Sequence, residues 1–535
     1  MIIGTPRHKA TLAKRYDTIV IGSGMSGLAT AACLSKAGQK VLVLEQHYTA
    51  GGFTHTYTRK GYEWDVGLHY IGEVHRPNST IRRIFDYISD SGLQWAQMDE
   101  VYDRIYLGDE SFDLVTGVER FRAKMLSYFP QEQQALDRYL QLIRDVNASS
   151  SMFFLHKALP NSLAKILRLP LCRRYLKFAE QTTADVLLTL TKNAKFIAVL
   201  TGQWGDYGLP PKSSSFAMHA MVVKHYLNGA SYPVGGSASI ARTIEPVIQK
   251  SGGQIVTRAA VEEIIVEHNK AVGVRLQGGQ EIRAKTIISS VGVENTLGRL
   301  LDQATIEKHG LKRQLANIEP SMAHVGVYIG LQASDKELGL ATSNLWLYPD
   351  EHHDANLAAM KQPGHKFPVI FISFPSSKDP EWDAKFPGKS TIEIVAPAPY
   401  EWFKQWQGSR WQKRGKDYTK FKQELQDTLL ESLYRIHPQL IGRIHFAELS
   451  TPLSTDHFCR YKTGEIYGIN HTPRRFQQKW LRPATPITNL YLTGQDIVTC
   501  GVGGALISGV LTTIRVLGLW RSRVLLTMLK PKRSR

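Results

Sequence analysis

Residues 16–45 read YDTIVIGSGMSGLATAACLSKAGQKVLVLE, two apolar runs on either side of a glycine-rich turn. The runs 16–21 and 40–44 predict buried strands, and 26–37 predicts a helix of small residues that ends at Gly38. A strand, a GxGxxG turn, a helix and a second strand ending in an acid form the fingerprint of a dinucleotide-binding βαβ unit. We therefore expect an α/β fold built around a Rossmann-like, three-layer domain.

The glycines of this turn indicate what it binds. Gly22, Gly24 and Gly27 allow a tight turn and let backbone N–H groups approach a pyrophosphate at the positive end of the helix. Glu45, 18 residues after Gly27, is placed to accept hydrogen bonds from ribose hydroxyl groups. We expect the turn to hold an adenine dinucleotide, which the neighbouring side chains also contact, namely Ser23, Met25, Ser26 and Gln46.

A second glycine-rich helix start lies near the other end of the chain. Residues 489–492 predict a buried strand that leads into a polar turn and then into GVGGAL at 501–506. A helix that begins without side chains offers free N–H groups and a positive dipole end, although such a turn can also form without a ligand. Two such starts suit a cofactor longer than one mononucleotide. We therefore expect flavin adenine dinucleotide (FAD), with its ribityl and ring end near Gly494, Asp496, Gly503 and Ala505.

The signals for nucleotide binding are separated along a chain of 535 residues, which is too long for one core. A helical middle at about 120–230 and strand-like runs within 321–400, without helical crossovers, predict a second domain with an antiparallel sheet. The expected division is an FAD-binding domain (15–85, 230–300 and 480–516), a substrate-binding domain of mixed or antiparallel sheet plus helices (86–229 and 301–479) and a basic tail (517–535).

Composition narrows the class of protein. The chain is 43% hydrophobic and 21% charged, as in ordinary globular proteins. Its four cysteines lie far apart and form no CxxC pair, so we expect neither a disulfide framework nor a metal site. No apolar leader precedes the first strand, and the apolar stretch 500–514 is short, glycine-rich and closed by Arg515. These features predict a cytoplasmic protein without a signal peptide or a spanning helix.

The net charge of +19 calls for a partner or a surface. The basic residues form no motif that reads nucleic acid, so we do not expect a nucleic-acid partner. They are instead mixed with apolar residues, in 151–179, which has six Lys and Arg and no acid, and in the tail from Trp520. That mixture predicts peripheral contact with an anionic membrane, and the alternative is a solvated helix with a frayed tail.

Other motifs occur in the order known from one family. They include Gly51-Gly-Phe-Thr-His-Thr-Tyr57, Asp65-Val-Gly-Leu-His-Tyr-Ile-Gly72, Met218-His219, Tyr232-Pro-Val-Gly-Gly236, Tyr467-Gly468 with His471, and Leu492-Thr-Gly-Gln-Asp496. From about residue 15 to 515 the chain resembles the retinol-saturase-like members of the phytoene desaturase, carotenoid isomerase and flavin amine oxidase superfamily. The vertebrate members begin with a signal segment that is not seen here, so an endoplasmic-reticulum location is not expected.

The resemblance implies roles for further residues. Gly51, Gly52, Phe53 and Thr54 would lie against the flavin, and Val261 would meet the adenine through its backbone. Amine oxidases often carry a basic residue after the two glycines, and its replacement by Phe53 and Thr54 argues against amine chemistry.

The activity that the resemblance implies is FAD-dependent hydrogen transfer at carbon–carbon double bonds of a long apolar polyene or isoprenoid, with retinol-saturase-like reduction favoured. Desaturation, cis/trans isomerisation and action on a fatty acyl chain are alternatives, and so is a lipid carrier without flavin chemistry, like the GDP-dissociation inhibitors of prenylated GTPases. One dinucleotide fingerprint is present, so NAD(P)H is expected only as a transient electron donor. The oligomeric state is left open.

Four residues in the family-like motifs are candidate proton donors, because histidine and tyrosine can hold and release a proton beside a flavin. The alternative for each is a packed, hydrogen-bonded structural role. The candidates are His69, Tyr70, His219 and His471.

Overall fold

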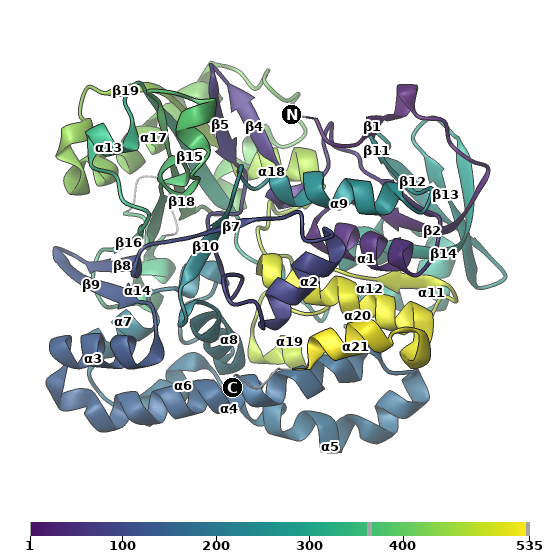
Figure 1. The fold of residues 1–535 in the computed structure, drawn as a ribbon, viewed down its shortest axis with the longest axis horizontal. Helices are drawn as coiled ribbons and strands as arrows, with labels where there is room; N and C mark the ends of the chain where they lie inside the picture. Colours follow the sequence, from purple (N-terminus) through teal and green to yellow (C-terminus); the bar gives the residue numbers. More distant parts are fainter. Residues whose placement is uncertain (1, 361–365, 531–535) are drawn as a thin grey trace.

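The computed structural model describes residues 2–360 and 366–530, and its largest sheet contains the expected βαβ unit (Figure 1). Parallel pairing joins β1, β11, β3, β2 and β14 in that order, and β20 also pairs with β14 in parallel, whereas β13 and β12 continue the sheet antiparallel. The α/β fold class is confirmed. The strands are β1 (Thr5–Pro6), β2 (Arg15–Ile21), β3 (Val41–Leu44), β11 (Gln254–Thr257), β12 (Val261–Glu267), β13 (Lys270–Leu276), β14 (Glu281–Ser289) and β20 (Leu490–Leu492).

Helix α1 (Met25–Lys36) occupies the centre of this domain and is buried from Met25 to Ser35. It packs against α9 (Ser239–Gln249) and α20 (Gly501–Arg521), and its many alanines let those helices come close. A Cβ atom on Gly509 of α20 would lie 2.8 Å from Cβ of Ala29. This close crossing brings together the two glycine-rich helix starts that the chain separates by about 470 residues.

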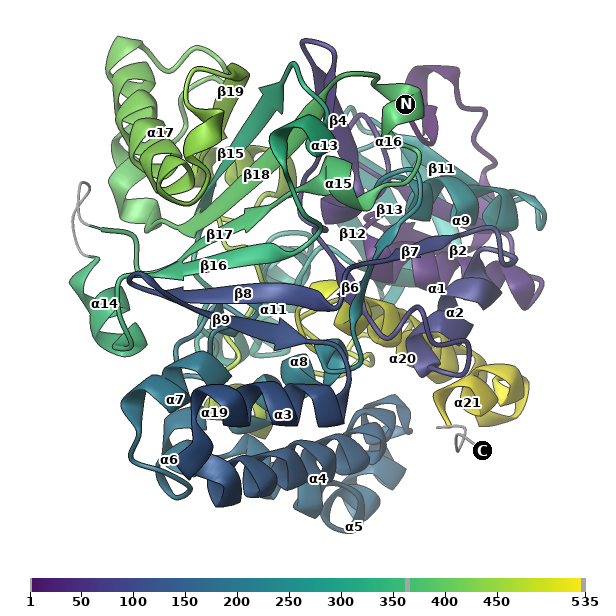
Figure 2. The same ribbon diagram turned by 60° about the vertical axis from the view of Figure 1, so that its left-hand side comes forward.

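The second sheet has the order β19-β15-β18-β17-β16-β8-β9 and is antiparallel except for the pair β16–β8. Helix α17 (Lys416–Ile436) covers it with Leu425, Leu429 and Leu433, which lie four residues apart on one face (Figure 2). The strands are β8 (Val101–Leu107), β9 (Glu110–Val115), β15 (His324–Leu331), β16 (Asn344–Tyr348), β17 (Ile370–Ser373), β18 (Ser390–Pro397) and β19 (Ile444–Ser450).

The helical middle lies below the second sheet in Figure 2. Its helices are α3 (Val118–Tyr128), α4 (Gln133–Ala158), α5 (Asn161–Ala179), α6 (Thr183–Leu188), α7 (Ala194–Leu200) and α8 (Phe216–Tyr226). A small sheet of β6 (Ile71–Gly72), β10 (Ala230–Pro233) and β7 (Trp95–Gln97) adjoins them.

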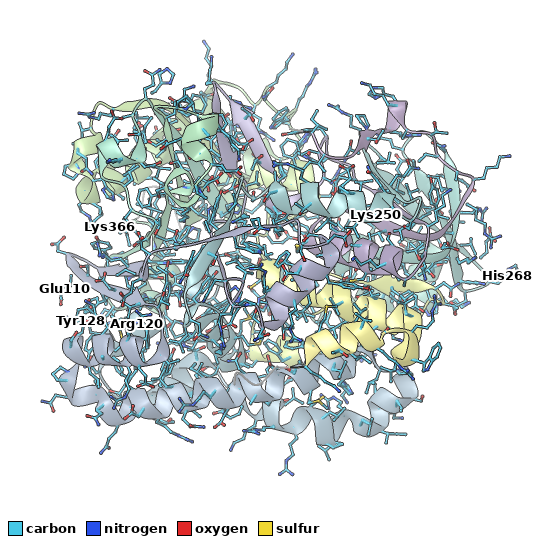
Figure 3. All side chains as sticks on the ribbon, viewed as in Figure 1. Glu110, Arg120, Tyr128, Lys250, His268 and Lys366 are labelled. Atoms are coloured by element: carbon cyan, nitrogen blue, oxygen red, sulfur yellow. The ribbon has the colours of Figure 1, made fainter. Side chains whose placement is uncertain are left out.

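Side chains fill the space between the layers, with Glu110 and His268 at opposite edges in Figure 3. Short elements complete the fold. They are the hairpin β4 (Thr56–Arg59) and β5 (Tyr62–Asp65), with α2 (Thr80–Ile88), α10 (Val293–Gly298), α11 (Gln303–Lys308), α12 (Leu311–Leu315), α13 (Asp335–Leu338), α14 (His353–Ala359), α15 (Pro375–Lys378), α16 (Trp382–Lys385), α18 (Pro452–Cys459) and α19 (Pro473–Gln477).

Up to residue 530 the end of the chain is mainly helical and is not a frayed tail. Helix α20 extends to Arg521 with a kink at Gly518, whose φ of 78° and ψ of 163° are not helical, and α21 (Arg523–Leu529) follows with Leu525 and Met528 buried. The guanidinium of Arg83 donates to the carbonyl oxygen of Lys530 at 2.7 Å, which ties α21 to α2. Residues 531–535, which include three of the basic residues of the predicted tail, lie outside the described residues.

Helix α20 bears on the expectation that the chain has no spanning helix. It is the one helix among the described residues that is long and apolar enough to cross a membrane, because the apolar stretch continues beyond Arg515. Its residues from Ser508 to Ile514 are nevertheless buried, and the helix packs against α1 and α4. These contacts account for its apolar character as a core helix of the nucleotide-binding domain.

Candidate functional site

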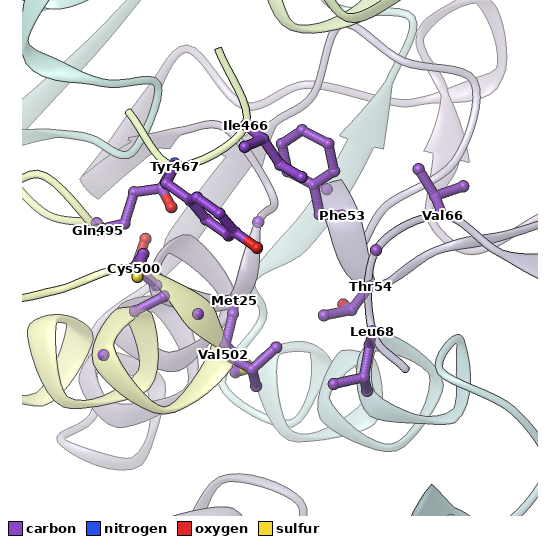
Figure 4. Close-up of a pocket in the computed structure, with 18 of the residues that line it drawn as sticks. Met25, Phe53, Thr54, Val66, Leu68, Ile466, Tyr467, Gln495, Cys500 and Val502 are labelled. Carbon is purple, nitrogen blue, oxygen red and sulfur yellow. The ribbon is translucent and has the colours of Figure 1, made fainter. Parts of the chain in front are cut away.

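A cavity of about 1260 Å³ is lined by residues of both large sheets and reaches both glycine-rich helix starts. Met25 of α1, Thr54 of the 51–54 loop and Val502 of α20 face one space in Figure 4. Pockets for single ligands usually measure about 300–1,000 Å³, so this cavity has room for a dinucleotide and a second molecule. Of the predicted cofactor residues it is lined by Gly22, Gly24, Met25, Ser26, Glu45, Gln46, Gly51, Gly52, Phe53, Thr54, Val261, Gly494, Gly503 and Ala505.

The three glycines of the first turn have different roles. Gly22 adopts φ +91°, which side chains other than glycine rarely allow. Gly24 faces open space, since an added Cβ would meet only Ser290 Oγ at 4.0 Å. Gly27 does not line the cavity, and a Cβ there would lie 2.1 Å from the carbonyl oxygen of Gly22. Gly27 therefore serves the close approach of helix and loop, and its expected contact with the pyrophosphate stays a prediction.

Glu45 is buried and fixes the turn while keeping acceptor capacity for a ligand. Its Oε2 accepts from the backbone N–H of Ser23 at 2.9 Å and from the Ser23 hydroxyl at 2.7 Å, and its Oε1 accepts from His47 N–H at 2.8 Å. A carboxylate has about four acceptor positions, so one remains for a ribose hydroxyl group, and Glu45 lines the cavity. Ser23 itself does not line the cavity and acts on the turn through Glu45.

Neighbouring residues hold the loops beside this turn. The Ser26 hydroxyl lies 3.1 Å from Ser290 Oγ, and Gln46 donates to the carbonyl oxygen of Phe458. In the 51–54 loop the Thr54 hydroxyl donates to the carbonyl of Gly51 at 2.8 Å. Each of these contacts joins segments far apart in the chain or closes a turn, so the cavity wall at the first turn is fixed by the protein alone.

At the second helix start the structure contradicts one assignment. Gly494, Gly503 and Ala505 line the cavity, but Asp496 does not. Its Oδ2 accepts from Val293 N–H at 2.8 Å and its Oδ1 from Ile469 N–H at 3.0 Å. Asp496 therefore joins two loops behind the cavity and does not line the ribityl chain, as the sequence had led us to expect.

Two of the four candidate proton donors lie away from the cavity. His219 is enclosed by Tyr139, 2.8 Å from its Nε2, and Tyr207, 3.2 Å from its Nδ1, and burial lowers its pKa to about 3. His471 accepts from the backbone N–H of Cys500 at 3.0 Å, and burial lowers its pKa well below the usual range. Neither lines the cavity. Both assignments as proton donors are wrong on geometry, and His471 instead holds the start of α20.

The other two candidates, His69 and Tyr70, line the cavity. His69 Nδ1 lies 2.8 Å from Glu393 Oε2, although the angle is outside that of a hydrogen bond, and burial with the nearby Lys378 charge lowers the pKa of His69 to about 4. Tyr70 stacks on Tyr226 with ring centres 4.2 Å apart.

Several buried ionisable groups that the sequence did not indicate lie near His69 and Tyr70. Burial lowers the pKa of Lys378 to about 7 and raises that of Glu393 to about 8. The ammonium of Lys378 donates to the carbonyl oxygen of His69 at 3.1 Å and to Ser373 Oγ at 2.7 Å. Asp206, which directly precedes Tyr207 in the chain, also lines the cavity. No spacing in the sequence marks these residues, because they come from β18, α15 and a loop and meet only in the fold.

The residues present fit FAD. Two helix N-termini point N–H groups at one cavity, Gly24 leaves space that a side chain would fill, and Glu45 keeps an acceptor position. The arrangement provides a pyrophosphate site at α1 and a ring site between the 51–54 loop and α20.

Comparison with known proteins agrees with this fit. Residues 25–517 match the family described as flavin containing amine oxidoreductase. The chain is 38% identical to the all-trans-retinol 13,14-reductase of Danio rerio, across 93% of this chain and 85% of that protein. It is 27% identical to the chloroplastic prolycopene isomerase of Daucus carota, across 94% of this chain and 80% of that protein.

A solved structure with the same fold is cyclohexylamine oxidase from Brevibacterium oxydans, with a TM-score of 0.59 at 16% identity, covering 95% of this chain and 99% of that one. That likeness shows the fold alone.

Proposed function

The chain belongs to the family of flavin-containing amine oxidoreductases, and we propose that this member is an FAD-dependent enzyme that reduces a carbon–carbon double bond in a long apolar polyene, similar to retinol. The observation that carries the proposal is the continuity of the cavity. One space touches both helix N-termini and an apolar arm lined by Met218, Trp346 and Phe371. The two relatives named above, a retinol reductase and a prolycopene isomerase, support a polyene over an amine.

FAD, when bound, supplies a carrier of two electrons and a hydride equivalent. The chain's own residues then have two tasks. The N–H groups of α1 and α20 hold the cofactor, and the apolar arm orients the polyene and excludes water from it. For the electron donor we propose NAD(P)H in transient contact, since the sequence carries a single dinucleotide fingerprint.

The reduced protein, incubated without oxygen with retinol, is expected to add two hydrogens to the substrate, as measured by mass spectrometry of the product. Lycopene and an unsaturated fatty acid serve as parallel substrates, and oxidised protein is the control. An unchanged mass with altered retention would identify an isomerase, and a loss of two hydrogens a desaturase. Purified protein that releases no flavin on denaturation would contradict the proposal that the protein is an FAD-dependent enzyme.

We further propose that the polyene enters from an anionic membrane at the cytoplasmic surface. Two residues that line the cavity are also exposed to solvent, namely Met152 of α4 and Lys530 after α21. Large apolar side chains are exposed on adjacent elements, and cations accompany them. This mouth surface consists of Leu163, Ile166, Leu169, Leu519, Trp520 and Val524 with Lys165, Arg173, Arg174, Arg521 and Arg523. Apolar and cationic residues on one face suit the boundary of an anionic bilayer.

Replacing Ile166 and Leu169 by serine is expected to weaken binding to phosphatidylserine-containing vesicles by at least about 10-fold, because two side chains, 75% and 71% exposed, no longer enter the lipid. Co-sedimentation with vesicles measures the effect. The matched control is Ile441→Ser, since Ile441 is 63% exposed but lies beyond α17, away from the mouth surface. Equal loss in both variants, or no binding by the wild type, would contradict membrane entry at this face.

A further inference from the structure

The hydroxyl group of Tyr70 lies between two carboxyl groups. Its oxygen is 3.0 Å from Oδ2 of Asp103 and 3.0 Å from Oδ2 of Asp206. A phenol has one proton and can donate to one carboxylate at a time. Two ionised carboxylates at this separation would also repel each other in a buried site. One of the two carboxyl groups must therefore carry a proton and donate to the Tyr70 oxygen.

The hydrogen-bond partners identify which one. Asp103 is fully buried and accepts from Gln203 Nε2 at 2.7 Å and from Asn344 Nδ2 at 3.0 Å, besides Tyr70. Asn344 in turn accepts from the ammonium of Lys378, which places a positive charge one residue away from Asp103. Three donors and a nearby cation stabilise the ionised form of Asp103.

Asp206 has the opposite environment. Among residues 2–360 and 366–530, Tyr70 is the one side chain that its carboxyl group contacts by a hydrogen bond. Burial and the negative charge of Asp103 raise the pKa of Asp206 well above its usual range. The proton of the cluster therefore resides on Asp206, which donates to Tyr70, and Tyr70 donates to Asp103.

The position of Asp206 gives this proton access to the reaction space. Asp206 and Tyr70 both line the cavity, whereas Asp103 lies behind them. The thiol of Cys500 donates to the backbone carbonyl of Asp206 at 3.4 Å, and Cys500 is the residue at which α20 starts. Asp206 thus adjoins the helix start that lines the ring end of the cofactor site, where Cys500 and Val502 project in Figure 4.

We propose that Asp206 is the proton donor of the reaction and that Tyr70 and Asp103 are positioning residues that keep it loaded. The inference rests on the proposed function. The π bond of the polyene breaks, one carbon receives a hydride equivalent from reduced FAD, and the neighbouring carbon receives the proton as the O–H bond of Asp206 breaks. FAD, when bound, would supply the hydride equivalent, and the external donor would return it to its reduced form. Asp206 ends as a carboxylate beside ionised Asp103 and regains a proton from water, because their repulsion favours the protonated form.

Asp206→Asn is the decisive variant, since it keeps the size of the side chain and its contact with Tyr70 but removes the acid. With reduced holoenzyme and retinol in a single turnover, the rate of double-bond reduction is expected to fall about 10²- to 10⁴-fold, the usual contribution of a general acid. FAD content and the melting temperature should stay at wild-type values. Tyr70→Phe is expected to lose less, because the acid remains. The control is Asp335→Asn, which removes a half-buried carboxyl outside the cavity lining and should leave the rate unchanged.

A second readout does not depend on turnover. The infrared difference spectrum of the oxidised wild type minus Asp206→Asn at neutral pH should contain the carbonyl band of one protonated carboxylic acid, because the bands of other buried acids such as Glu393 are common to both proteins and cancel. A wild-type rate in Asp206→Asn, or loss of no band, would overturn the assignment of Asp206. If the wild type itself adds no hydrogen to any polyene, the proposed function fails and the donor role fails with it, while the infrared band still reports where the proton resides.

Discussion

Gly24→Ala is expected to give a folded protein that no longer retains FAD. The backbone of Gly24 has φ −64° and ψ 172°, which any residue can adopt, and the added methyl group meets no protein atom closer than 4.0 Å. The methyl group therefore occupies cavity space at the start of α1, where the backbone must approach a pyrophosphate closely. The protein itself loses no more than about 1 kcal/mol, the cost of alanine at a helix N-cap.

The expected weakening of FAD binding is at least about 100-fold, which corresponds to about 2.7 kcal/mol. Titration of the apoprotein with FAD measures it, and thermal melting of the apoprotein checks that the fold is intact. Gly298→Ala in α10 is the control, since its added Cβ would meet only flexible side chains, Leu315 Cδ1 at 3.2 Å and Glu294 Cγ at 4.0 Å. A Gly24→Ala protein that binds FAD like the wild type would show that the cavity at α1 is not the pyrophosphate site.

Much of the nucleotide-binding domain could be predicted, because its signals are local. The strand expected at 16–21 is β2 from Arg15 to Ile21, and the one expected at 40–44 is β3 from Val41 to Leu44. Buried strands in such folds are continuous apolar runs, and glycine spacing encodes a backbone shape directly. The ends of α20 and the helix α21 were harder to predict, because their limits depend on packing against α1 and α2.

The site was predictable only where backbone shape determines it. Most of the glycines that were expected to bind the cofactor line the cavity, but a motif does not tell which way a side chain points. His219 and His471 sit in family-like motifs, yet both ring nitrogens of His219 contact tyrosine hydroxyl groups, and Nε2 of His471 accepts from the start of α20. Asp206 was missed for the converse reason. Its proton follows from the meeting of three chain segments, at residues 70, 103 and 206, which no sequence pattern records.

Gly27→Ala is expected to have the opposite outcome to Gly24→Ala, although both glycines belong to one motif. In a helix interior alanine normally stabilises a protein by up to about 1 kcal/mol relative to glycine. Here its Cβ would lie 2.1 Å from the carbonyl oxygen of Gly22, far inside van der Waals contact. The carbonyl cannot move aside freely, because the N–H of Gly22 is bonded to Leu44 of β3 at 2.8 Å and Gly22 already holds φ +91°.

Relief of this clash must separate α1 from the β2 turn, in a helix that is buried on all sides by the sheet, α9 and α20. We expect a loss of more than about 4 kcal/mol, which is a large part of the 5–15 kcal/mol that stabilises a typical domain. Chemical denaturation of the apoproteins of Gly27→Ala, Gly24→Ala and the wild type measures it without any contribution from FAD. If the third glycine of the motif instead served the cofactor, the two apoproteins would unfold at the same denaturant concentration. A large shift confined to Gly27→Ala would show that this glycine joins helix to loop, and that Gly24 leaves room for the ligand.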